Sequence, residues 1–129
     1  MENIEVPVSV GELMDKISIL EIKQNRIQET HKLENIKREL TYLLNIREEH
    51  IPIDGEVEEL YGRLKETNEN LWEVEDRIRR CESKKDFGEE FIQLARFVYH
   101  ENDKRAKLKS DLNNKLGSHL REEKSYQNY

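Results

Sequence analysis

The sequence predicts an all-α protein in which four helices form an antiparallel arrangement, dominated by one long, coiled-coil-like hairpin and preceded by an extended N-terminal arm. Three observations favour this fold class. Charged residues make up 39% of the 129 positions and hydrophobic residues 35%, which is typical of long helices that face water. Only five Gly and two Pro interrupt the chain. Apolar residues also recur three and four positions apart over long stretches, as one face of a helix requires. We expect a single domain over residues 1–129.

The first eight residues predict an extended arm. Ile4, Val6 and Val8 alternate with polar positions, which is the period of a strand. Pro7 lacks a backbone N–H, so the arm would suit the edge of a sheet or a strap along the surface.

The first helix is expected over residues 10–27. Ser9 and Glu12 have the spacing of a capping box, which satisfies free N–H groups at a helix start. Two apolar stripes follow, so we expect this helix to contact two neighbours. The stripes consist of Val10, Leu13, Ile17 and Leu20, and of Ile19 and Ile22.

The second helix is expected over residues 31–49, with Thr30 as its N-cap. Its apolar face weakens toward the C-terminal end, and Pro52 disfavours a helical residue before it. The face consists of Leu33, Ile36, Leu40, Leu43 and Leu44.

The third helix, expected over residues 55–81 and capped by Asp54, has the clearest pattern in the chain. Its apolar positions alternate in steps of three and four over more than three heptads, as in a coiled-coil seam. The seam consists of Val57, Leu60, Leu64, Thr67, Leu71, Val74, Ile78 and Cys81.

The fourth helix is expected over residues 87–116, with Asp86 and Glu89 as a second capping box and Gly117 as a C-terminal cap. A second stripe on this helix predicts that it occupies the centre of the bundle. The first stripe consists of Phe87, Phe91, Leu94, Val98, Glu101, Arg105, Leu108 and Leu112, and the second of Ile92, Ala95, Tyr99, Asn102 and Ala106.

Residues 117–129 have little periodicity and are expected to form a tail, which Tyr126 and Tyr129 could strap to the helices. A helix of about 30 residues is about 45 Å long, which exceeds the span of a compact domain of this size. Part of the hairpin should therefore protrude or pair with another chain. We expect a homo-oligomer, a dimer in the first instance, and a protein partner.

The seam of the hairpin becomes polar on both helices at one level, where Thr67 and Asn68 would face Glu101 and Asn102. One interpretation is a layer that fixes register and partner choice. The other is a pocket for a small anionic ligand such as a phosphorylated sugar or a nucleotide, because arginine binds phosphate through two parallel hydrogen bonds. Besides these four residues, the pocket would use Trp72, Arg96, Tyr99, Asp103 and Arg105, with Asp15 and Lys16 from the first helix.

The sequence has no motif that predicts catalysis. The four histidines are scattered, so we expect no metal site, and we expect no cofactor. Cys81 falls on the seam, which favours a packed thiol. The basic residues Lys104, Arg105, Lys107 and Lys109 lie among acids and are interpreted as a solvated face. The net charge of −6 argues against nucleic-acid binding, because neutralising phosphates requires a basic surface. No membrane span or signal peptide is recognisable, so a cytoplasmic location is expected.

Four segments resemble a family of small helical proteins of bacteria and their phages that is classed as a domain of unknown function. They are SVGELMDKISILEIK at 9–23, NENLWEVEDRIR at 68–79, FIQLARFVYHENDKRAKLK at 91–109 and LGSHLREEKSY at 116–126. The resemblance covers most of the chain, with the second helix its least distinctive part. It implies an association with genes for sugar transfer and surface polysaccharides, and it assigns no catalytic residue.

Three functions are consistent with these features. The first is a non-catalytic helical protein that binds other proteins, as an adaptor does. The second is a small-molecule binding protein for an anionic sugar phosphate or nucleotide, linked to polysaccharide or glycosyl-transfer pathways. The third is an acidic, phage-type inhibitor of a host protein, which would compete for a basic surface through charge complementarity.

Overall fold

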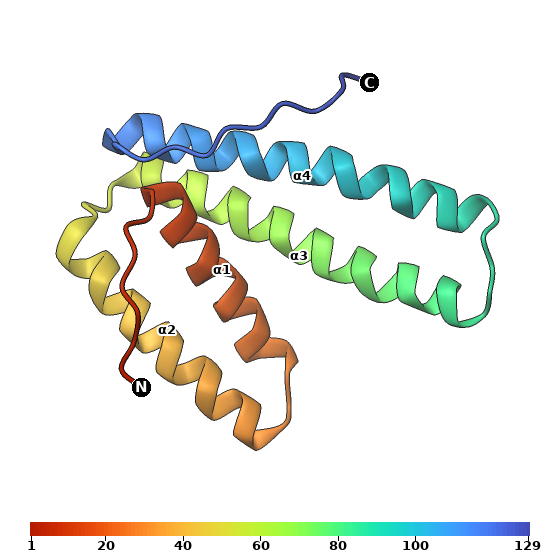
Figure 1. The fold of residues 1–129 in the computed structure, drawn as a ribbon, viewed down its shortest axis with the longest axis horizontal. Helices are drawn as coiled ribbons and strands as arrows, with labels where there is room; N and C mark the ends of the chain where they lie inside the picture. The colour runs from red at the N-terminus through yellow and green to blue at the C-terminus, as the bar shows by residue number, and fades with distance from the viewer.

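Four α-helices account for the secondary structure of the computed structural model, which describes residues 1–129. The helices are α1 (Val10–Arg26), α2 (Thr30–His50), α3 (Gly55–Ser83) and α4 (Glu89–Leu116). They form two antiparallel hairpins, and α1 of the first hairpin packs against both helices of the second (Figure 1). The predicted all-α fold class is confirmed.

The centre of the molecule is α1, which contacts all three other helices, whereas α4 contacts only α1 and α3. The prediction that the fourth helix is central is therefore wrong. Ile92 and Tyr99, which suggested it, are 47% and 42% exposed. The prediction of two neighbours for the first helix falls short by one. Its two apolar stripes leave few positions for solvent, which is why it suits the central place.

The main core lies where α1 meets the other helices, and all four helices contribute to it. The buried members of this core are Leu13, Met14, Ile17, Leu20, Ile36, Leu40, Ile51, Val57, Leu64, Leu108 and Leu112. Burying one aliphatic side chain of this kind contributes roughly 1.5–3 kcal/mol to the stability of the fold. A second core, with only Val74, Cys81 and Leu94 buried, lies farther out between α3 and α4.

Three predicted helix ends are confirmed. The Ser9 hydroxyl accepts a hydrogen bond from the backbone N–H of Glu12 at 3.1 Å. The Asp54 carboxylate accepts one from the N–H of Val57 at 2.9 Å. Gly117 ends α4 in the left-handed conformation, with φ of 65°, which a residue without Cβ adopts at little cost.

Other helix ends differ from the prediction. Thr30 is the first residue of α2 rather than its cap, and Glu29 at the cap position makes no side-chain capping bond. The fourth helix begins at Glu89 and not at residue 87. The turn before it places Lys85 at a positive φ of 54°, and the Asp86 carboxylate accepts the N–H of Gly88 at 3.1 Å. Asp86 therefore stabilises the turn instead of capping the helix.

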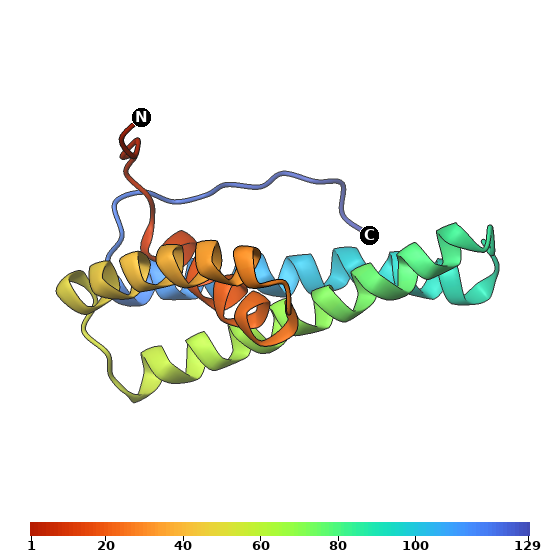
Figure 2. The ribbon, with the colours of Figure 1, turned by 90° about the horizontal axis from the view of Figure 1, so that it is seen from below.

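The hairpin of α3 and α4 extends well beyond α1 and α2, as the helix lengths predicted (Figure 1). Its helices have 29 and 28 residues, or about 43 Å each. The N-terminal arm and the C-terminal tail lie on one side of the helices (Figure 2). The arm is not helical, and Ile4 in it is 81% exposed.

Candidate functional site

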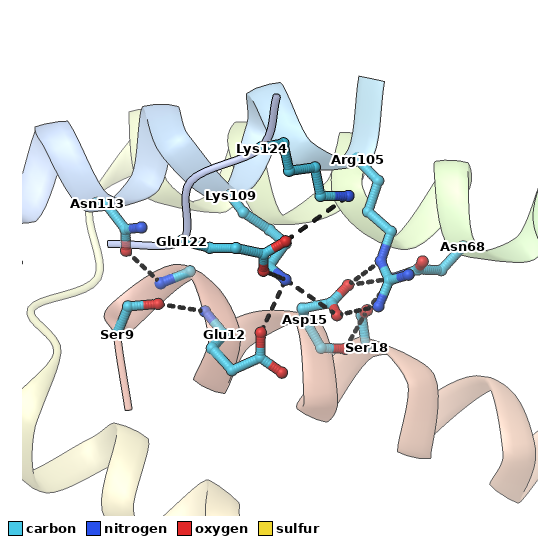
Figure 3. Close-up of polar contacts among 11 residues, drawn as sticks. Ser9, Glu12, Asp15, Ser18, Asn68, Arg105, Lys109, Asn113, Glu122 and Lys124 are labelled. Atoms are coloured by element: carbon cyan, nitrogen blue, oxygen red, sulfur yellow. Dashed lines mark hydrogen bonds and ion pairs between the residues drawn. The ribbon is translucent and has the colours of Figure 1, made fainter. Parts of the chain in front are cut away.

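A buried carboxylate, Asp15, connects three helices. Its side chain is 1% exposed and accepts two hydrogen bonds from Arg105 of α4, at 2.9 and 2.5 Å (Figure 3). The amide of Asn68, from α3, donates to the same carboxylate at 2.8 Å and to the Ser18 hydroxyl at 2.8 Å. That hydroxyl donates to the backbone carbonyl of Asp15 at 2.7 Å. The side chains of Asp15 and Ser18 thus have partners on other helices.

Lys109, one turn farther along α4, links the same region to the C-terminal tail. Its ammonium group lies 2.8 Å from a carboxylate oxygen of Glu12, 3.0 Å from one of Glu122 and 3.9 Å from one of Asp15. Lys124 contacts Glu122 at 3.6 Å. The side chain of Lys109 is only 10% exposed, so the prediction that it belongs to a solvated face is wrong. Its attachment to three acids is the physical reason.

The environment keeps the charges of this cluster in place. Burial by itself would raise the pKa of Asp15, but hydrogen bonds from Arg105 and Asn68 and the nearby positive charges hold that pKa below its usual value. The hydrogen bonds to Asp15 raise the pKa of Arg105. Burial would lower the pKa of Lys109, but its bonds to Glu12 and Glu122 raise it. The bond to Lys109 lowers the pKa of Glu122. All four groups are therefore ionised at neutral pH.

The start of α1 is fixed through its backbone to α4 and to the residues just after it. The N–H of Gly11 donates to the Asn113 side chain at 2.7 Å, and that of Val10 to the Ser118 hydroxyl at 3.3 Å. Together with the Ser9 cap, these bonds satisfy three N–H groups that a helix start leaves free. A Cβ atom added at Gly11 would lie 2.5 Å from the carbonyl oxygen of Lys109. Only glycine permits this close approach of the two backbones.

The predicted polar layer of the hairpin is divided in the structure. Asn68 contacts α1, and the Thr67 hydroxyl donates to the carbonyl of Arg63 at 2.9 Å, so neither bonds to the opposite helix. Glu101 is 3% exposed, and one of its oxygens contacts Lys104 at 3.2 Å. Its other oxygen has no hydrogen-bond partner. The side-chain hydrogen bonds of Asn68 therefore go to α1 and not to Glu101 or Asn102.

The other predicted pocket residues lie elsewhere. Tyr99, Asn102 and Asp103 line an open cavity of about 1250 Å³ between α4 and tail residues 124–129. The Tyr129 hydroxyl donates to Asp103, and its ring lies 5.3 Å from that of Tyr99. The remaining three do not line it: Arg96 and Lys16 are exposed, and Trp72 is half-buried. The structure thus joins Asp15, Asn68 and Arg105 but keeps the other candidates apart from them.

Several members of the cluster were not among the predicted site residues. Lys109 lies four residues after Arg105, and Glu12, Asp15 and Ser18 follow each other at intervals of three, so each set shares a helix face. That spacing is a usable signal. No signal in the sequence connects Glu122 to Lys109, because the tail has no period that relates it to a helix.

The cluster has the properties of a structural lock. Each cation is neutralised by carboxylates of the same chain, and no exposed nucleophile lies among them. Cys81 is buried in the second core, and burial together with Glu90 and Asp86 raises its pKa, which disfavours the reactive thiolate. No three His, Cys, Asp or Glu side chains gather to hold a metal ion. None of the helices has the length and apolar character needed to cross a membrane.

The outer hairpin, which we define as residues 70–100, presents a different kind of surface. Four large apolar side chains on it are between 38% and 52% exposed, namely Phe87, Ile92, Phe97 and Tyr99. The α3 row that contacts α1 through Asn68 continues outward, by helix spacing, through Trp72 and Arg79. The corresponding row of α4 continues from Arg105 through Val98 and Phe91, which pack against the second core. Within the chain, the outer hairpin contacts Arg26 at the end of α1 through Glu73, at 2.5 Å, and the end of the tail through Tyr99 and His100.

Comparison with known proteins gives a family and no function. No curated protein and no solved structure matches the chain. Residues 4–129 match a family of unknown function, DUF6165. This match includes all four segments on which the resemblance to a domain of unknown function was based. Because it extends over nearly the whole sequence, the protein belongs to the DUF6165 family of unknown function.

Proposed function

We propose that the protein is a non-catalytic helical interaction protein that binds another protein chain through its outer hairpin. One observation carries this proposal. Beyond α1 the hairpin buries only Val74, Cys81 and Leu94, while large apolar side chains remain exposed on its surface. Exposed apolar groups that gather on one element are typical of interaction sites.

The residue types support binding to a protein. Three of the four large exposed side chains of the outer hairpin are aromatic, namely Phe87, Phe97 and Tyr99. Aromatic residues are enriched in protein interfaces, where they bury much area with few rotatable bonds to order. A helix that lays its apolar face on such a surface is a common mode of recognition.

The inner half of the hairpin shows what kind of element can cover the surface of the outer hairpin. There α1 lies against both α3 and α4, and it is a helix. The outer half presents the continuation of the same two helices. A further helix could therefore extend the packing that α1 begins.

The alternatives have less support. A sugar phosphate or nucleotide would need free cations, whereas Arg105 and Lys109 are bound to Asp15, Glu12 and Glu122. An acidic inhibitor would need an acidic binding surface. The outer hairpin has seven acidic and six basic residues, so its charge is nearly balanced.

The test compares two substitutions that add the same charge at neighbouring positions. Ile92→Glu places a carboxylate in the exposed apolar surface, and Gln93→Glu places one at an exposed polar site beside it. Tagged wild-type protein and both variants capture proteins from the cells that produce the chain, including untagged copies of it. We expect one protein to be retained by the wild type and by Gln93→Glu.

The same protein should be retained about tenfold less by Ile92→Glu, since burial of one aliphatic side chain contributes roughly 1.5–3 kcal/mol. Circular dichroism checks that both variants keep the wild-type helix content. The proposal fails if no captured protein depends on Ile92. Thermal stabilisation by sugar phosphates or nucleotides would then favour the ligand-binding alternative.

A further inference from the structure

The sign of the charge along α3 reverses at one step, between Asp76 and Arg77. Residues 66–76 contain five acidic side chains and no basic one. Residues 77–85, which include the following turn, contain five basic side chains and one acidic one. We call these segments the acidic block and the basic block. The acidic block carries Glu66, Glu69, Glu73, Glu75 and Asp76, and the basic block carries Arg77, Arg79, Arg80, Lys84 and Lys85. All ten are exposed except Glu69, which is half-buried.

This order is self-complementary. A two-fold axis brings the same surface of two copies together. If that axis is perpendicular to α3, the two α3 helices run antiparallel. If the axis passes near the Asp76–Arg77 step, the acidic block of each α3 lies along the basic block of the other. Glu73 of one copy then lies opposite Arg80 of the second, and the same pair occurs again across the axis.

From this pattern we infer that the partner on the outer hairpin is a second copy of this chain, paired antiparallel about a two-fold axis near Asp76 and Arg77. The inference rests on the proposed function, because it names the occupant of the same surface. It joins two outer hairpins side by side into four helices, the number in a four-helix bundle.

The apolar residues of the outer hairpin fit such pairing. Trp72 lies next to the charge reversal on α3, and Phe91, Ile92 and Ala95 lie on the adjoining part of α4. A second hairpin placed there would cover these side chains and enlarge the small core of Val74, Cys81 and Leu94. The nearly balanced charge of the outer hairpin also limits repulsion between two copies of an acidic protein.

Existing ion pairs do not prevent this exchange. Arg79 contacts Glu75 at 2.6 Å, and Arg77 contacts Glu90 at 3.3 Å, and each of these four side chains is more than half exposed. Glu73, which is 54% exposed, contacts Arg26 of α1 at 2.5 Å, and Arg26 is 34% exposed. Pairs between exposed side chains contribute little to stability. They can therefore be replaced by pairs between copies. A foreign helix would not require the reversal of sign within α3, which is why the pattern favours a second copy.

Charge exchange tests the arrangement. The first variant carries Glu73→Lys, Glu75→Lys and Asp76→Lys, so that both blocks are basic. The second carries Arg77→Glu, Arg79→Glu and Arg80→Glu, so that both are acidic. By sedimentation, we expect the wild type to form a dimer that weakens with added salt. Each variant alone should dimerise at least tenfold more weakly, because like charges face each other.

An equal mixture of the two variants should recover dimers, since each block again faces its opposite. This recovery also shows that both variants are folded. A wild type that remains monomeric at every accessible concentration overturns the inference, as does a mixture that dimerises no better than either variant alone.

Cross-linking tests the position of the axis. Asp76→Cys places a thiol next to the axis in both copies, and a short bismaleimide should join the copies there. Glu66→Cys is the matched control, because its two thiols would lie about 30 Å apart along the helices. The buried Cys81 of the unmodified chain measures the background. Equal cross-linking at both positions contradicts the antiparallel register.

The outcomes separate this inference from the proposed function. If the chain is monomeric but Ile92→Glu still abolishes retention of a different protein, the outer hairpin is an interaction surface and the second copy is the wrong partner. If neither self-association nor the retention of another protein depends on the outer hairpin, the inference and the proposed function both fail.

Discussion

At the level of single residues, Asp15 determines how α1 attaches to the hairpin. A buried carboxylate is costly unless it is paired and hydrogen-bonded. Here three hydrogen bonds from Arg105 and Asn68 satisfy it. Because the partners come from α3 and α4, the bonds form only when both helices are in place. The carboxylate thus makes the docking of α1 specific as well as stable.

Asp15→Asn should destabilise the fold strongly. The substitution removes the negative charge that neutralises Arg105 and leaves that guanidinium half-buried without its carboxylate partner. We expect the free energy of unfolding, measured with urea, to fall by about 3 kcal/mol, as for other broken buried pairs. The control is Glu34→Gln at an exposed position of α2, which should change the free energy of unfolding by no more than about 0.5 kcal/mol. Equal effects at the two sites would contradict the role of Asp15.

The acid dependence of stability should have the same origin. The pKa values of Asp15 and Glu122 lie below their ordinary values of 3.8 and 4.5. Their contribution is therefore fully present above the ordinary values and is lost as the pH falls through the lowered ones. We expect the free energy of unfolding to decline below about pH 4. The decline should be shallower in Asp15→Asn combined with Glu122→Gln, and an unchanged slope would exclude this explanation.

At the level of the helices, periodicity in the sequence predicts the four elements well. Each helix has an apolar stripe that no strand could place on one face. Helix ends are less predictable, because Asp86 and Glu89 match a capping box although the turn requires the Asp86 side chain for the N–H of Gly88. The fourth helix was wrongly predicted to be the central one because an apolar stripe shows that a helix face is hydrophobic but not which element covers that face. On α4 the outer part of the second stripe remains exposed.

The candidate site was predictable to a similar degree. The lapse of the apolar seam indicated Asn68 and Arg105 as candidates. Asp15 was added as a polar group of the first helix that could converge on them. The contacts among these three residues could not be predicted. The seam relates α3 only to α4, and it does not indicate how α1 crosses α3 and α4. Glu122 was beyond prediction, since its contact with Lys109 depends on the path of an aperiodic tail.

Gly11→Ala tests the contact between α1 and α4. Alanine is the better helix former by about 1 kcal/mol, but here its Cβ would collide with the Lys109 carbonyl. The collision would also strain the bond from Gly11 to Asn113. We expect a net loss of about 1–3 kcal/mol in thermal or urea unfolding, the usual cost of overpacking.

Gly62→Ala on α3 is the matched control, since its Cβ would meet no atom within 4 Å. It should stabilise the protein by about 0.4–1 kcal/mol. A stabilising Gly11→Ala would show that α1 does not approach α4 as closely as described.

At the level of the whole molecule, the two ends of the long hairpin have different roles. The inner end is covered by α1 and locked by the charged cluster around Asp15. The outer end has a small core and exposed aromatic side chains, so it has free surface for a second chain. Because the charged cluster around Asp15 fixes α1 at the inner end, the outer hairpin projects from the molecule, and its surface is accessible to a second chain.

Hydrogen exchange measured at low and high protein concentration tests this division most directly, because it reports protection helix by helix. We expect amides of the outer hairpin, residues 70–100, to gain protection as concentration rises, while those around Asp15, Leu64 and Leu112 are strongly protected throughout. A gain confined to the N-terminal arm and α2, or no change in the outer hairpin at any concentration or with any captured partner, would contradict the assignment of the outer hairpin as the binding surface.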